Sequence, residues 1–310
     1  MKQLSLLLLL LLSACASTQG GQAVVAPPEV SPMLFRLGTT TFTVADYSRR
    51  LEAEIGAGIA QLMAQGQSRE QIEQLANASD IRSAVFDRML QDALLLDYAR
   101  RNGIGVDPAI IDAAAPPPVQ DDAAPAVPGA QPTATAAEQR AEIAREQLIF
   151  EVIARNTRAD MFHARHILVA DEAAADLALA DLAAGAEFAT LARERSTDTG
   201  SAAQGGDLGW TPRGNFVPEF EEAAFSAPLN TPTKVESQFG WHVIEVLERQ
   251  EQRPFDSFAE LQQSSNAQNF YEQSFVPWYE ELRRQAEANG ELVIAPDFDL
   301  SSVPLPFPEN

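Results

Sequence analysis

The chain of 310 residues has a formal net charge of −22, from 22 Lys and Arg against 44 Asp and Glu. This excess of acidic groups argues against nucleic acid as a partner, because the phosphate backbone needs clustered Lys and Arg. It also argues against a broad electrostatic attachment to anionic lipid. The length is sufficient for two domains of ordinary size.

The first residues predict export and attachment to a membrane. An apolar run over Leu4–Leu12 is too short to span a bilayer and has the form of a signal-peptide core. It ends in Leu-Ser-Ala-Cys15, and this cysteine is the only one, so it has no partner for an internal disulfide. The four residues resemble the lipobox of bacterial lipoproteins. The resemblance implies a signal peptide over 1–14, lipidation of Cys15 as the membrane anchor, and a flexible tether over 15–32. The alternative is an ordinary secretory signal that contains a cysteine.

Residues 33–112 predict the first part of a helical domain. A short strand-like piece with a turn at Gly38-Thr39-Thr40 comes first, over Leu34–Phe42. Apolar residues then recur at helical spacing in three segments, of which the third runs from about Asp80 to Arg101. Residues typical of helix starts and stops punctuate the pattern. They are Thr43, Ser68, Asn102-Gly103 and Asp107-Pro108.

The rest of the chain outside 161–250 is partly helical. Residues 113–137 are mostly Ala, Pro, Gln and Asp and predict a disordered insertion. A helical pattern resumes over 138–160, and 254–295 predicts one long amphipathic helix followed by a short strand. The proline-rich tail over 296–310 is expected to be loose. The predicted helices on both sides of 161–250 have apolar faces that need partners. We therefore predict an α+β fold in which residues 161–250 form a domain inserted into, or appended to, a helical domain.

Residues 161–250 carry several motifs in a fixed order. They are Ala164–Val169, Ser196-Thr197-Asp198, Gln204–Trp210, Val217–Phe220 and Gln238–Ile244. Together they resemble parvulin-type (PpiC) peptidyl-prolyl cis/trans isomerases along the whole segment. The resemblance implies a four-stranded antiparallel sheet wrapped by helices, with no metal and no other cofactor. The wider layout resembles the extracytoplasmic foldases of the PrsA and SurA type, in which a helical, chaperone-like domain accompanies parvulin domains.

The resemblance also implies the site residues. His166, Asp198 and His242 match the catalytic positions of the family, and Leu208, Phe216 and Phe220 match the positions that hold the substrate proline ring. An X-Pro bond rotates over a barrier of about 18–20 kcal/mol without any bond being broken. A dry pocket and a polar network could therefore lower it without a nucleophile. The alternative is that the histidines form a core network that fixes the sheet, and that the aromatic residues are core.

Acidic residues lie where phosphate-directed parvulins carry a basic cluster. Asp171, Glu172 and Asp176 occupy that region, so no preference for a phosphorylated substrate is expected. The sequence thus predicts a prolyl isomerase that assists unfolded or partly folded exported proteins with X-Pro bonds. It would act at the outer face of the cell membrane, or at the outer membrane of an organism that has two. One alternative is a holdase chaperone whose parvulin domain is a non-catalytic peptide-binding module. Another is a lipoprotein that helps to assemble envelope components.

Overall fold

The computed structural model describes residues 31–115, 135–296 and 298–308. Cys15, the predicted signal peptide and most of the predicted insertion lie outside the described residues. Contacts divide the chain into a first unit, Met1–Val152 with Tyr279–Asn310, and a second unit, Ile153–Trp278. The second unit is therefore inserted in sequence between two parts of the first. None of the described helices is long and apolar enough to cross a bilayer.

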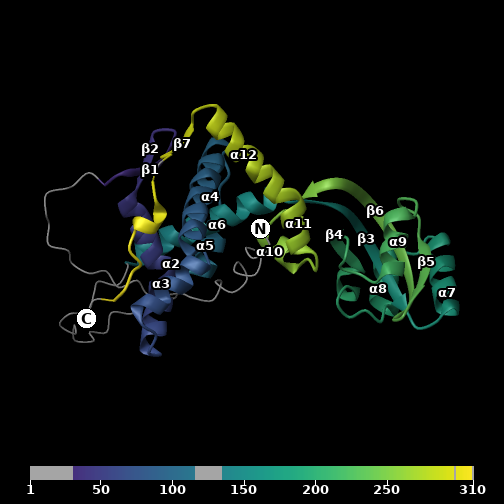
Figure 1. Ribbon diagram of the computed structural model, residues 1–310. Coiled ribbons are helices and arrows are strands. Elements are labelled where there is room, and N and C mark those ends of the chain that lie inside the picture. Colours follow the sequence, from purple (N-terminus) through teal and green to yellow (C-terminus); the bar gives the residue numbers. More distant parts are fainter. Residues whose placement is uncertain (1–30, 116–134, 297, 309–310) are drawn as a thin grey trace. The chain divides into compact units, whose positions relative to one another are not determined.

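The first unit combines helices with a small sheet (Figure 1). Its elements are β1 (Met33–Leu37), β2 (Thr40–Thr43), α2 (Val44–Ala64), α3 (Arg69–Ala78), α4 (Ile81–Arg101), α5 (Pro108–Ala114), most of α6 (Ala136–Asn156), most of α12 (Val276–Ala288), β7 (Leu292–Ile294) and η3 (Leu300–Ser302). The sheet has the order β2-β1-β7, with both pairs antiparallel. The predicted strand-like piece near the start is a pair of strands joined at the predicted turn, and the predicted closing strand is confirmed.

Local sequence sets the helix starts in this unit. The Thr43 side chain accepts a hydrogen bond from the amide of Asp46, whose carboxylate accepts one from the amide of Thr43. Ser68 and Gln71 form the same reciprocal pair ahead of α3. Gly103, just after α4, adopts a left-handed φ of 63°. These capping residues were predicted and are confirmed. Thr43 and Ser68 bond amide groups that have no partner inside the helix, and Gly103 has the left-handed backbone typical of a helix stop.

The tail is not loose where it is described. Val303 and Leu305 are only 2 % and 4 % exposed, and Leu305 joins an apolar cluster with Ile59 and Ile72. The prediction of a loose tail is wrong for residues 298–308. Its proline-rich composition disfavours long helices and strand pairing, but it does not prevent apolar side chains that alternate with proline from packing individually.

The second unit is built on a four-stranded antiparallel sheet with the order β4-β3-β6-β5 (Figure 1). Its elements are β3 (Arg158–Val169), α7 (Glu172–Ala183), α8 (Phe188–Arg195), η1 (Ala202–Gln204), β4 (Asp207–Pro212), α9 (Pro218–Ser226), β5 (Thr233–Ser237), β6 (Gly240–Pro254), α10 (Phe258–Gln263), α11 (Ala267–Phe270) and the π-helical turn η2 (Tyr271–Phe275). The predicted α+β class and the four-stranded antiparallel sheet are confirmed.

The central strands β3 and β6 carry a separate apolar core on each face. On one face, Ile167, Val169 and Val243 pack with side chains of α7 and α8. On the other, Phe162 and Ile244 pack with side chains of α9. Because successive residues of a strand point to opposite faces, the even-numbered residues 162 to 166 of β3 share the α9 face. His166 belongs to this second face.

The chain after β6 differs from the prediction. One continuous helix was expected from 254, but β6 runs to Pro254 and α10 ends at Ser264, where the backbone is extended. The Ser257 hydroxyl accepts from the amide of Glu260, and the Ser264 hydroxyl accepts from the amide of Asn266. Serine side chains that bond to nearby amides favour turns and caps over helix interiors, which explains the break. This segment as far as Trp278 belongs to the second unit, which is wider than the predicted 161–250.

Candidate active site

Two histidines lie side by side at the centre of the second unit's sheet. His166 is in β3 and His242 is in β6, where it pairs with Leu168. Leu168 and His166 point to the same face, so the two rings are diagonal neighbours across the strands. Both residues are buried, and their Nδ1 atoms are 3.3 Å apart. The structure therefore brings together the two histidines that the sequence analysis paired.

Asp198 closes one end of this pair. Its Oδ2 atom lies 2.7 Å from Nε2 of His166 and accepts a 2.5 Å hydrogen bond from the hydroxyl of Ser201. The same hydroxyl is 3.1 Å from Nε2 of His166. Ser196 fixes the loop that carries Asp198, because its Oγ atom accepts from the amides of Asp198 and of Leu168 in β3. The predicted aspartate is thus positioned by its neighbours to contact the histidine pair.

Ser237 closes the other end. Its Oγ atom is 2.7 Å from Nε2 of His242 and accepts a hydrogen bond from the amide of Phe239. Ser237 is the last residue of β5 and pairs with Gly240 across a tight turn. The sequence analysis missed both Ser237 and Ser201. The available signal was a serine in the same short loop as Asp198 and another just across a turn from His242.

The surroundings lower the pKa values of both Asp198 and His242. Burial raises the pKa of Asp198, but hydrogen bonds from Ser201, His166 and the amide of Gly200 outweigh it and lower the pKa to about 2. Burial and the neighbouring His166 lower the pKa of His242 to about 4, against a smaller opposing effect of Asp198. At neutral pH Asp198 is therefore ionised and His242 is neutral.

Hydrogen bonds link these groups into one chain. A carboxylate can only accept, so Nε2 of His166 carries the hydrogen that bonds to Asp198. Nδ1 of His166 lies at hydrogen-bond distance from Nδ1 of His242, and the neutral His242 ring can donate through one nitrogen and accept through the other. The Nε2 atom of His242 bonds the hydroxyl of Ser237. The result is a fully bonded, buried polar chain that holds both rings in one orientation.

Aromatic side chains cover this chain on the α9 face. The Phe220 ring meets His166 and His242 edge-on, with centroid distances of 5.6 Å and 5.2 Å. Phe216 stacks on Phe220 at 4.6 Å, and Leu208 packs against the same cluster. Phe220 is fully buried, whereas Phe216 and Leu208 are half-buried. Of the three predicted ring-holding residues, two therefore offer surface to a ligand and Phe220 lies beneath them.

Comparison with known proteins agrees with this geometry. Residues 147–250 match the family described as PPIC-type PPIASE domain. This chain contains a PPIC-type domain. It is 41 % identical over 122 residues to the foldase protein PrsA 1 of Bacillus cereus, which is 38 % of this chain and 43 % of that protein. It is 36 % identical over 138 residues to the chaperone SurA of Legionella pneumophila, which is 41 % of this chain and 32 % of that protein. The chain thus matches less than half the length of either relative.

A solved structure of peptidylprolyl isomerase PrsA from Bacillus anthracis is also similar. It shares 25 % identity, and the match covers 52 % of this chain and 77 % of that one, with a TM-score of 0.31. A score this low does not by itself relate the two whole chains. The motif match over 147–250 and the agreement of the sheet carry the assignment of the PPIC-type domain.

A glycine is required beside the histidine pair of the PPIC-type domain. Gly206 has a φ of 80°, and its carbonyl accepts a hydrogen bond from the amide of His166. A Cβ atom at this position would lie 2.2 Å from the carbonyl oxygen of His166. Asp207 follows it and accepts from the amide of Gly209, with its Oδ1 atom 2.8 Å from Nε2 of His163. Gly206 and Asp207 therefore fix the backbone where the chain enters β4.

Proposed function

We propose that this chain is a peptidyl-prolyl cis/trans isomerase that acts on unfolded or partly folded exported proteins. The observation that supports it best is the hydrogen-bond chain from Asp198 to Ser237, which is covered by Phe220, on which the half-buried Phe216 stacks. Isomerisation breaks no covalent bond, so a site of this kind needs no nucleophile and no cofactor.

The pocket and the polar chain have separate tasks in this proposal. Phe216 and Leu208 hold the proline ring by apolar contact, with Phe220 as the floor. A planar amide is stabilised by charge separation, which a dry pocket disfavours, while the twisted amide loses that resonance. The rigid pair of His166 and His242 keeps the floor in place, so contacts that fit the twisted amide better than the planar one lower the barrier.

The substrate is not phosphorylated. Lys234 in β5 contacts the acidic segment after β3, and its Nζ atom is already paired with Glu172 at 2.8 Å and with Asp176. A phosphate beside Ser or Thr would face these two carboxylates and would have to compete with them for Lys234. A Ser-Pro peptide is therefore expected to be isomerised faster than its phosphoserine counterpart, and equal rates or the reverse order would contradict this part of the proposal.

The decisive experiment measures isomerisation of a short Ala-Pro-Phe peptide by NMR exchange. The full chain is compared with Phe216→Ala, with Asp198→Asn and with a control, Leu177→Ala. The Leu177 side chain is exposed on α7, the helix that packs on the other face of the sheet. We expect wild type and control to catalyse exchange and the other two variants to lose at least about tenfold, or about 1.4 kcal/mol of barrier lowering. A folded wild-type chain without catalysis would overturn the proposal and leave a non-catalytic peptide-binding domain.

The chain is anchored by lipid on Cys15 at the outer face of a bacterial membrane, or at the outer membrane where there are two. The support is the Leu-Ser-Ala-Cys15 sequence after an apolar run. Two or three acyl chains give far firmer attachment than one, at about 0.8 kcal/mol per buried methylene. Cys15→Ser is expected to move the protein from the membrane fraction to the soluble fraction and to abolish labelling by palmitate. A variant that keeps both properties would exclude the lipid anchor.

A further inference from the structure

The tail segment (residues 298–308) lies on an apolar surface of the first unit like a bound peptide. The side chains that contact Leu305 and Phe307 come from three helices, and together they are named the tail-binding surface. They are Ile55, Ile59, Leu62, Met63, Ile72, Ala76 and Ile81. In the tail, Val303, Leu305 and Phe307 each precede a proline, and the first two are buried. A residue before proline favours extended backbone, so every second side chain points to the surface.

The tail is held through its main chain. Nε of Arg82 donates to the carbonyl of Val303 at 3.0 Å, and Nη2 of Arg69 donates to the carbonyl of Pro308 at 3.1 Å. The Arg69 guanidinium also lies 5.0 Å from the centre of the Phe307 ring. Among the described residues, the backbone amides of the tail bond only within it, as from Phe307 to the carbonyl of Leu305. Carbonyl groups and spaced apolar side chains are features that any extended, proline-rich segment could supply.

Arg82 is held in place independently of the tail. Its Nη1 atom donates to Asn77 at 2.9 Å and its Nη2 atom to Glu73 at 3.0 Å, both in α3. The Arg82 residue is buried, so its Nε–H group, which bonds the tail, needs an acceptor whether or not the tail is there. This fixed, buried donor is the kind of group that recognises a peptide carbonyl without regard to the side chain.

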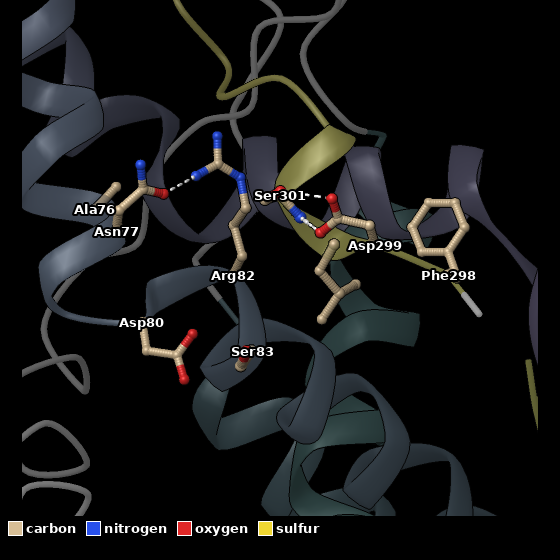
Figure 2. Close-up of a pocket in the computed structure, with 9 residues that line it drawn as sticks. Ala76, Asn77, Asp80, Arg82, Ser83, Phe298, Asp299 and Ser301 are labelled. Atoms are coloured by element: carbon tan, nitrogen blue, oxygen red, sulfur yellow. Dashed lines mark hydrogen bonds between the residues drawn. The ribbon is translucent and has the colours of Figure 1, made fainter. Parts of the chain in front are cut away.

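The tail does not fill the space available to it. A pocket of about 310 Å³ lies beside its start, lined by Asn77, Arg82 and Ser83 on one side and by Phe298, Asp299 and Ser301 on the other. Figure 2 shows the Arg82–Asn77 hydrogen bond on the helix side and the Asp299–Ser301 hydrogen bond within the tail. Leu75, one turn after Ile72 in α3, is 57 % exposed. The polar pocket and the free leucine extend the surface beyond what the tail covers.

We infer that the tail-binding surface is a binding site for extended, proline- and leucine-containing segments of unfolded chains, and that residues 298–308 occupy it as an internal competitor. The inference rests on the proposed function only in taking unfolded chains as the partner, since the surface is distinct from the histidine site. The tail and an outside peptide would compete for the same surface. The surface therefore binds an outside peptide only in the fraction of molecules whose tail is released.

The test uses a fluorescent peptide with the sequence of residues 298–308 and the full chain, with binding followed by anisotropy. Leu305→Asp places a charge in the buried cluster and releases the tail, so we expect it to bind the peptide at least about tenfold more tightly than wild type. Ser302→Asp adds the same charge at an exposed position of the tail and is expected to bind like wild type. Equal affinity of Leu305→Asp and wild type would overturn the inference.

Two further variants distinguish a real site from a disturbed one. Leu305→Asp combined with Ile72→Asp in the surface is expected to lose peptide binding, and tight binding by this double variant would also overturn the inference. If Leu305→Asp does not fold by circular dichroism, the milder Phe307→Ala decides, with an expected gain of about threefold and no gain as the contrary result. Isomerase activity of wild type on the Ala-Pro-Phe peptide is recorded separately. A lack of isomerase activity would contradict the proposed function but would not affect the conclusion about peptide binding.

Discussion

Both units contain paired charges, as the second does at Arg253 with Asp256 and at Glu245 with Arg165, but their central polar groups differ. In the first unit these groups are charged and paired across helices, as for Arg82 with Glu73 at 3.0 Å and Asp92 with Arg50 at 2.9 Å. In the second unit the buried centre is a hydrogen-bonded histidine pair with one carboxylate at its edge. Removal of one ion-pair partner leaves a charge behind, whereas removal of the neutral His242 or of a serine hydroxyl leaves only an unbonded group. The central ion pairs of the first unit thus fix how its helices pack, and the hydrogen-bonded histidine chain of the second unit orients a site.

The position of the tryptophans makes the comparison measurable. Trp210, Trp241 and Trp278 are the only tryptophans of the chain, and all lie in the second unit. Tryptophan fluorescence therefore follows the unfolding of the second unit. Far-UV circular dichroism is weighted toward the first unit, because it contains the long helices α2 and α4. Urea unfolding followed by both signals assigns each effect to one unit.

The largest effect is expected at the centre of the second unit. Phe220→Ala removes a fully buried ring that contacts both histidines, and we expect it to lower the free energy of unfolding by roughly 3–5 kcal/mol. The fluorescence midpoint in urea should fall and isomerase activity should disappear. Phe239→Ala is the control, since Phe239 is 64 % exposed and its loss should cost less than about 0.5 kcal/mol. Similar effects of the two changes would mean that the aromatic floor does not support the site.

The corresponding change in the first unit is expected to be somewhat smaller. Arg82→Met leaves Glu73 without its partner and the carbonyl of Val303 without its donor, at a cost of about 2–3 kcal/mol. The value lies below that of a fully buried pair because Glu73 is partly exposed. The transition seen by circular dichroism should shift, and that seen by fluorescence should not. Arg49→Met, with a 72 % exposed side chain, serves as the control. A shift of the fluorescence transition alone would contradict the assignment of Arg82 to the first unit's stability.

Acid should weaken the second unit through His242. Its pKa is lowered to about 4 in the folded chain, whereas an unfolded histidine has a pKa of about 6.5. Below about pH 6.5 the unfolded chain takes up a proton that the folded chain refuses until about pH 4, so stability falls as the pH falls through this window. We expect a loss on the order of 2 kcal/mol in the fluorescence-monitored free energy between pH 7 and pH 4. His242→Gln should show a smaller loss, and equal slopes for the two proteins would exclude His242 as the cause.

The smallest effect is expected at the end of the hydrogen-bond chain. Ser237→Ala removes the hydroxyl that bonds Nε2 of His242, for a loss of about 1 kcal/mol in the second unit. Nitrogen NMR of the His242 ring should show that its tautomer is no longer fixed. Ser226→Ala removes an exposed hydroxyl of α9 and should change stability by less than about 0.5 kcal/mol. An unchanged His242 tautomer in Ser237→Ala would show that the chain is oriented from the Asp198 end alone.

Much of the fold could be predicted because its signals are local. Capping boxes at Thr43 and Ser68, the stop at Gly103 and the strands around His166 and His242 each depend on a few neighbouring residues. The left-handed backbone of Asn230, φ 54°, likewise follows from the tolerance of asparagine for that conformation. The break at Ser264 was missed because helical periodicity on both sides outweighed the serine's competition for backbone amides.

By itself, the sequence determined most of the elements before Pro254, the order of the motifs in the PPIC-type domain, and the residue types of the histidine site. Only the tertiary structure decided what those residues touch. His166 and His242 are 76 residues apart and His166 and Asp198 are 32 apart, so their contacts depend on strand register and on the path of a loop. The same holds for Ser237 beside His242 and for Leu305 beneath α2 and α3. Dihedral preference and periodicity act within one element, whereas burial and hydrogen bonding between elements exist only after the chain has packed.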